Sequence, residues 1–106
     1  MLDADFEVKL NDTVLRELYR QIFWLQTNRT PQFAAKFESA FWQMVASLSA
    51  QPQRWQKIVV RGRTVHRAVL MQKLVLLYNV FPSEKRVAVI AMRGAAEDWT
   101  NQALPQ

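Results

Sequence analysis

The stretch from Thr64 to Met92, TVHRAVLMQKLVLLYNVFPSEKRVAVIAM, decides the fold because it predicts three consecutive β-strands. Its first part, Thr64–Met71, places side chains alternately on the two faces of a strand. Leu74–Phe81 is almost continuously apolar, which is typical of a central strand covered on both faces. Pro82–Lys85 predicts a turn, and the β-branched residues of Arg86–Met92 predict a further strand.

Two shorter strands are predicted upstream of this stretch. Asp5–Leu10 alternates polar and apolar residues, which is the period-two pattern of a half-buried strand. Lys57–Val60 is short and rich in β-favouring residues, and Gly62 separates it from the strand that follows.

Two amphipathic helices are predicted between the first and second strands. After the capping residues 11–13, apolar residues recur at spacings of three and four from Val14 to near Asn28. A second helix begins at Thr30-Pro31, because Thr can accept a hydrogen bond from an orphan backbone N–H and Pro has the φ of a first helical residue. That helix ends before Pro52. The short connection makes the two helices an antiparallel hairpin, which needs a sheet to bury its apolar face.

The predicted order of elements is therefore β-α-α-β-β-β-β. This order favours an α+β fold in which an αα-hairpin packs on one face of a mostly antiparallel sheet of four to five strands. A length of 106 residues fits a single domain spanning 1–106, with a core of about 6–99 and a loose tail at 100–106.

Composition excludes several classes of function. The chain has no Cys and a single His, so disulfides, thiolate metal sites, cysteine nucleophiles and multi-histidine metal sites are excluded. We expect no metal and no cofactor. No apolar run reaches the roughly 18 residues of a membrane span, and the acidic N-terminus does not resemble a signal peptide. We therefore expect a soluble cytoplasmic protein that does not bind membranes.

Charge is concentrated in the second half of the chain. Residues 1–50 hold five basic and six acidic residues, whereas residues 51–106 hold nine basic and three acidic residues. The range 54–83 contains six basic residues and no acid: Arg54, Lys57, Arg61, Arg63, Arg67 and Lys73. A field of one sign favours a polyanion or an acidic protein as partner. A solvated face that only maintains solubility is the alternative.

The candidate residues for contact with a target are basic. Odd-numbered residues of a strand share a face, so Arg61, Arg63 and Arg67 form a cationic row if the strand pairing is unbroken. The break at Gly62 can turn that row off its axis. The alternative role for the row is to protect a sheet edge from aggregation. Lys73 and Arg93 complete the candidate set for nucleic-acid or target binding.

Proton transfer has few candidates in this sequence. His66 has an unperturbed pKa near neutrality, but alternation points it away from Arg67, and a structural or surface role is the favoured interpretation. Tyr78 ends a strongly apolar segment, where a Tyr is most often a core residue with its hydroxyl hydrogen-bonded. Among the four Trp residues, we expect Trp24 and Trp42 to be partly buried, whereas Trp55 and Trp99 are candidates for stacking on a base or anchoring a partner.

The order of elements and several segments together resemble the RelE/ParE superfamily of bacterial toxins, from about residue 6 to residue 99. The first strand leads into Asn11-Asp12 and a helix as the family's opening does, and the second helix carries a similar pattern at Ala35-Lys36-Phe37, Leu48 and Pro52. VHRAVLMQKLVLLYNV resembles the paired central strands, with Arg67 on the first strand and Tyr78 on the second, and EKRVAVIAM resembles the last strand.

The resemblance implies the toxin of a type II toxin–antitoxin module, a family also described as plasmid stabilisation proteins. The implied partner is a cognate antitoxin that wraps the toxin with a helix and an extended segment. ParE-like members inhibit DNA gyrase without being enzymes, whereas RelE-like members cut messenger RNA on the ribosome without a metal. Both a homodimer and a toxin–antitoxin hetero-oligomer stay open.

Departures from the family pattern bear on the cellular target. RNA-cleaving members commonly carry an Arg three residues before the Tyr, where this chain has Val75. Many members also carry an Arg, or a His with an Arg, just after the last strand, where this chain has Arg93 at the strand end but Ala95 and Ala96 at the later positions. Metal-free RNA cleavage needs groups that transfer protons. It also needs cations that stabilise the phosphorane-like charge. The departures favour the gyrase-directed branch. A metal-independent endoribonuclease that uses Arg67, His66, Tyr78 or Arg93, and a degenerate, non-toxic nucleic-acid- or partner-binding module, are the alternatives.

Overall fold

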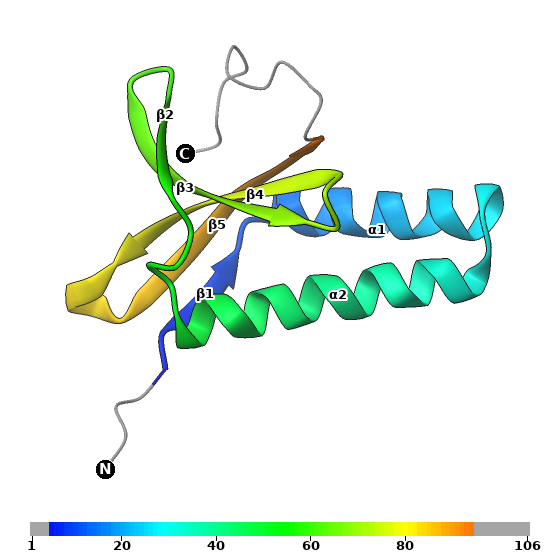
Figure 1. Cartoon of the computed structure of the whole chain (residues 1–106), viewed down its shortest axis with the longest axis horizontal. Coiled ribbons are helices and arrows are strands. Elements are labelled where there is room, and N and C mark those ends of the chain that lie inside the picture. Colours follow the sequence, from blue (N-terminus) through cyan, green and yellow to red (C-terminus); the bar gives the residue numbers. More distant parts are fainter. Residues whose placement is uncertain (1–4, 95–106) are drawn as a thin grey trace.

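A computed structural model describes residues 5–94 of the chain, as two helices packed on one face of a twisted sheet (Figure 1). The elements in chain order are β1 (Glu7–Leu10), α1 (Asp12–Asn28), α2 (Pro31–Ala50), β2 (Lys57–Val60), β3 (Arg63–Leu70), β4 (Leu74–Phe81) and β5 (Arg86–Gly94). A short 3₁₀ helix, Pro82–Glu84, forms the predicted turn between β4 and β5.

The five strands form one sheet in the order β1-β5-β4-β3-β2. Strands β2 to β5 pair antiparallel with their neighbours, and β1 pairs parallel with β5. The predicted α+β class, the helical hairpin and the mostly antiparallel sheet are confirmed. Strand β4 occupies the middle of the sheet, as its continuous apolar sequence predicts.

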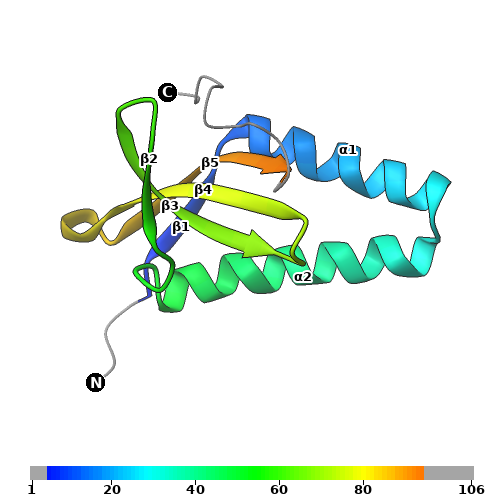
Figure 2. The same cartoon turned by 45° about the horizontal axis from the view of Figure 1, so that its top comes forward.

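The helix boundaries follow from side-chain caps. Asn11 caps α1, with its side-chain oxygen accepting a hydrogen bond of 2.8 Å from the backbone N–H of Thr13. Thr30 caps α2, with Oγ1 accepting a hydrogen bond of 2.9 Å from the backbone N–H of Phe33. Each cap satisfies one of the backbone donors that a helix start leaves without an intrahelical partner. Both views show the two helices running past the sheet beyond the β3–β4 turn (Figures 1 and 2).

Buried side chains form two clusters, one on each face of the sheet. The larger cluster joins both helices to the sheet face that they cover, through residues that include Leu18, Phe41, Leu76 and Tyr78. The smaller cluster lies on the opposite face, which we call the distal face, and comprises Val60, Val65, Val75, Leu77, Ile90 and Ala91. All six of these side chains are 5% exposed or less. Both faces of β4 are therefore buried.

A β-bulge in β5 changes which side chains reach the distal face. Leu77 pairs with Ala91 and Tyr78 pairs with Val89, so Ile90 has no partner residue on β4. A bulge of one residue inverts the alternation of the strand beyond it. Val89 consequently faces the helices, whereas Arg93, which has the same parity, pairs with Val75 and lies on the distal face.

The β3 strand is shorter at its end than the sequence predicts. It ends at Leu70, whereas the prediction extended it to Met71. Met71 and Gln72 have φ angles of 52° and 60° and belong to the turn that joins β3 to β4. Two consecutive residues with positive φ are typical of tight hairpin turns, and that backbone conformation ends the strand.

Candidate functional site

The basic residues of the predicted row are placed by the β2–β3 hairpin. Arg63 pairs with Val60, and both therefore share the distal face with Val65 and Arg67. Arg61 is not part of this row. Its φ of 51° and the φ of 82° at Gly62 form the two-residue turn that ends β2. The prediction of a row of three is wrong for Arg61, because a turn of two residues in the left-handed region replaces the unbroken strand.

Arg67 and Arg93 lie on the distal face on two strands separated by β4. Both are partly exposed. Arg67 pairs with Leu77 and Arg93 with Val75, so each arginine stands beside a fully buried apolar side chain of the strand between them. Val75, where the resemblance expects an Arg, is part of this apolar floor. Together with Arg63, these two residues therefore give the distal face its cationic character around an apolar centre.

The Arg93 side chain has unused hydrogen-bonding capacity. Its Nη1 donates a 3.1 Å hydrogen bond to the backbone carbonyl of Met92, whereas its Nε is buried and has no acceptor within the described chain. A buried N–H without an acceptor destabilises the protein unless a ligand supplies one.

His66 and Tyr78 lie on the opposite side of the sheet from these arginines. His66 is 6% exposed and Tyr78 is fully buried beneath the helices. The imidazole Nδ1 lies 2.7 Å from the carbonyl oxygen of Trp55, so Nδ1 carries the hydrogen that is donated. The Tyr78 hydroxyl donates a 2.8 Å hydrogen bond to the carbonyl of Pro52. Both side chains hydrogen-bond the α2–β2 connection to the sheet, and neither lies in the same site as Arg67.

Burial also changes the acidity of Tyr78. Desolvation raises the pKa of the Tyr78 hydroxyl from 10.0 to about 12, and a hydrogen bond with the Trp55 backbone opposes part of that shift. A phenol with this pKa stays protonated at neutral pH. Neither of the two candidates for proton transfer is therefore exposed at the cationic surface.

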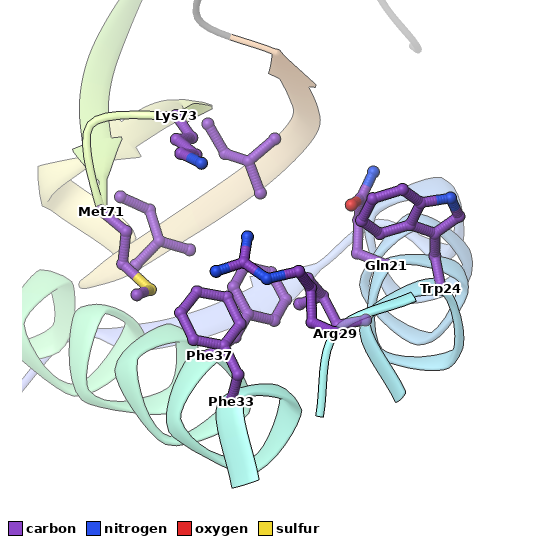
Figure 3. Close-up of a pocket in the computed structure, with 10 residues that line it drawn as sticks. Gln21, Trp24, Arg29, Phe33, Phe37, Met71 and Lys73 are labelled. Carbon is purple, nitrogen blue, oxygen red and sulfur yellow. The ribbon is translucent and has the colours of Figure 1, made fainter. Parts of the chain in front are cut away.

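The sequence did not predict an apolar groove at the other end of the molecule. This groove, of about 230 Å³, lies between the α1–α2 connection and the β3–β4 turn (Figure 3). Its lining includes Trp24, Leu25, Phe33, Phe37, Leu70, Met71 and Leu74, with Arg29 and Lys73 as its two cations. Lys73, a predicted target-binding residue, therefore lies at the groove and not with the distal arginines. The signal in the sequence is the pair of aromatic residues Phe33 and Phe37 close to the start of α2.

The tryptophans have different surroundings. Trp24 is 53% exposed and Trp42 is 40% exposed, so both present much of the indole ring to solvent. Trp55 is half-buried, with the guanidinium carbon of Arg54 5.4 Å from its ring centroid and its indole N–H lacking an acceptor within residues 5–94. Trp99 and the segment with Ala95 and Ala96 lie outside the described residues.

Within residues 5–94, no three His, Asp or Glu side chains come together as a metal site would require. None of the helices in the described part of the chain combines the length and apolar character needed to cross a bilayer.

This architecture also occurs in a solved protein structure. No protein-family model matches the chain, and a comparison with curated proteins gives no match. Among solved structures, the chain is similar to the RelBE2 toxin–antitoxin complex from Mycobacterium tuberculosis, with a TM-score of 0.62 and 16% sequence identity. The match covers 91% of this chain and 98% of the other. The chain has a RelE-like α+β fold.

The match extends over nearly the whole chain, as the resemblance in sequence predicts. At this level of identity it establishes the RelE-like fold and not the roles of individual residues. The two candidate surfaces for function are the cationic distal face and the apolar groove.

Proposed function

We propose that the chain is the toxin of a bacterial type II toxin–antitoxin module, acting in the cytoplasm and neutralised by a cognate antitoxin. The observation that carries this proposal is the RelE-like fold over 91% of the chain, shared with a toxin–antitoxin complex. The distal face supplies a surface for an anionic target, because Arg67 and Arg93 frame its apolar centre. Target binding then rests on charge-assisted hydrogen bonds from these two guanidinium groups.

Inhibition of DNA gyrase without catalysis is the favoured mode of action. Cleavage of RNA requires a group that accepts the 2′-hydroxyl proton and a group that protonates the leaving oxygen. His66 and Tyr78, the candidates for these steps, are buried under the helices and hydrogen-bonded to the α2–β2 connection. Their burial supports a surface that binds its target and does not cleave it.

Cleavage of messenger RNA is the second candidate, and one observation favours it. The Nε of Arg93 has no acceptor within the described chain, and a phosphate oxygen is a chemically suitable acceptor for a guanidinium N–H. Arg67 supplies a second cation on the same face, two strands away on β3. A degenerate module that binds nucleic acid without toxicity would use the same two residues.

Controlled induction of the full chain in a bacterial host tests the proposed function. We expect the native chain to arrest growth and the Arg67→Ala/Arg93→Ala variant to relieve that arrest. Lys36→Ala is the matched control, since Lys36 is exposed on α2 and its loss removes a charge away from the distal face. Normal growth with folded native protein would refute the toxin and leave the binding module.

Two assays on purified protein then separate the targets. Inhibition of gyrase supercoiling, with translation reactions free of specific cuts in messenger RNA, is the result we expect. Specific cleavage of ribosome-bound messenger RNA without inhibition of gyrase would assign the protein to the RelE-like branch. The Arg67→Ala/Arg93→Ala variant serves as the inactive control in both assays.

A further inference from the structure

The apolar groove has two walls that differ in chemistry. The end of α1 and the start of α2 form one wall, which is mainly aromatic, and the β3–β4 turn forms the other, which is aliphatic. Trp24 and Met71 stand at the rims and are 53% and 37% exposed. Exposed apolar side chains around a concave apolar surface are typical of a site that another molecule covers.

The charged groups of the groove are both cations. Arg29 follows α1, and its guanidinium carbon lies 4.7 Å from the centroid of the Phe33 ring. Figure 3 shows the Arg29 side chain extended over the two phenylalanines of the groove, with the Lys73 amine on the opposite wall. Within residues 5–94, neither Arg29 nor Lys73 has a carboxylate at ion-pair distance, because the ion pairs there are Arg20–Glu17 and Arg86–Glu84.

This arrangement sets a requirement on any molecule that covers the groove. A purely apolar occupant would remove water from Arg29 and give the guanidinium group no hydrogen-bond acceptor. Burying a charge without a partner is strongly unfavourable, whereas a carboxylate in the same place gives a bidentate, charge-assisted pair. The groove therefore complements a surface that is apolar and carries one negative charge.

We propose that the groove receives an amphipathic helix whose apolar face contains a single carboxylate, and that this carboxylate binds between Arg29 and Lys73. The inference rests on the proposed function in that the antitoxin is the protein that supplies this helix. Apolar residues of the helix at spacings of three and four contact the Trp24 and Met71 rims. Met71 and Lys73 have flexible side chains, which allows the aliphatic wall to adjust to the helix.

A selection from displayed peptides tests this proposal without using growth arrest. The full chain is used to select from a library of amphipathic helical peptides in which all residue types are allowed along one face. We expect the selected peptides to share one Asp or Glu at a fixed position within an otherwise apolar face. The probe for measurement is the tightest such peptide, together with a twin that has Gln or Asn at that position.

Calorimetric titration of these two peptides against four forms of the protein gives the decisive comparison. Against the native chain, we expect the acidic peptide to bind about tenfold more tightly than its neutral twin. Against Arg29→Gln, that preference should largely disappear, and Trp24→Ala should weaken both peptides. Arg16→Gln is the matched control, because Arg16 is exposed on α1 and does not line the groove, and it should keep the native preference.

Several results would overturn the proposal. Selected peptides without a shared carboxylate, a preference that survives Arg29→Gln, or binding that Trp24→Ala leaves unchanged would each do so, as would a selection that yields no binder. The outcome is separable from that of the toxin proposal. If the preference for the acidic peptide depends on Arg29 but the chain does not arrest growth, the toxin proposal alone is refuted. If the chain arrests growth but the preference does not depend on Arg29, the groove proposal alone is refuted.

Discussion

The imidazole ring of His66 stacks on the phenol ring of Tyr78, with the ring centroids 4.9 Å apart and the planes at 14°. His66 on β3 pairs directly with Tyr78 on β4, and each side chain hydrogen-bonds to a backbone carbonyl of the α2–β2 connection. This pair therefore joins three parts of the fold: the central strands, the end of α2 and the start of β2. We propose that its role is in stability and not in proton transfer to a target.

Replacing His66 tests that role. We expect His66→Ala to lower the free energy of unfolding by about 2–3 kcal/mol, because it removes the stacked ring and leaves the Trp55 carbonyl without its donor. His66→Phe, which keeps a ring but no donor, should cost less. Urea unfolding measures both. A stable His66→Ala protein that had lost growth arrest would instead indicate a catalytic His66.

The free energy of unfolding should change at alkaline pH because the Tyr78 hydroxyl loses its proton there. The hydroxyl loses its proton at about pH 10 in the unfolded chain but only at about pH 12 in the folded protein. Between these values the folded state binds the proton more tightly, so the free energy of unfolding falls as pH rises, by about 2–3 kcal/mol in all. Urea unfolding from pH 9 to pH 12 measures this dependence.

Tyr78→Phe provides the control for that dependence. It should cost about 1 kcal/mol at neutral pH, because the Pro52 carbonyl loses its donor. The Tyr78 contribution to the alkaline fall should be absent in this variant. An equally steep fall in both proteins would show that another group is responsible.

The bulged residue Ile90 should stabilise the protein through its side chain. Deleting Ile90 leaves Tyr78 paired with Val89 and Leu77 paired with Ala91, so Met92 and Arg93 keep their partners and their faces of the sheet. The deletion removes an apolar side chain that is only 5% exposed, and we expect it to cost about 2–5 kcal/mol. Ile90→Val, which keeps the bulge, should cost only about 1 kcal/mol. Thermal unfolding of both variants makes the comparison, and a deletion as stable as Ile90→Val would contradict it.

The cap of α2 should contribute measurably to the stability of the protein. Thr30→Ala removes the acceptor for the Phe33 backbone N–H and should lower the free energy of unfolding by about 1 kcal/mol. Thr27→Ala is the matched control, since the Thr27 hydroxyl donates only to the carbonyls of Phe23 and Trp24, which is a slightly unfavourable interaction in a helix. Equal losses in the two variants would exclude a special role for the cap.

Local sequence predicted most of the secondary structure. The boundary between the helices follows from Thr30-Pro31, and the helix-facing residues follow from apolar spacing, because caps and amphipathic periodicity act over a few residues. The strand Leu74–Phe81 was predicted with the bounds that the structure has. The burial of Tyr78 also follows from its apolar surroundings, with the hydroxyl hydrogen-bonded as expected.

Tertiary pairing decided what the sequence left open. Alternation alone places Arg93 with Val87 and Val89 toward the helices, and only the unpaired Ile90 moves it to the distal face with Arg67. The groove is also invisible in the sequence, because its walls come from α1, α2 and the β3–β4 turn, which are far apart along the chain. Periodicity and capping depend on neighbours within about one helical turn, so the sequence determined the elements and their apolar faces. Strand register and the meeting of distant elements depend on packing across the whole core, so only the tertiary structure decided which cations share a surface.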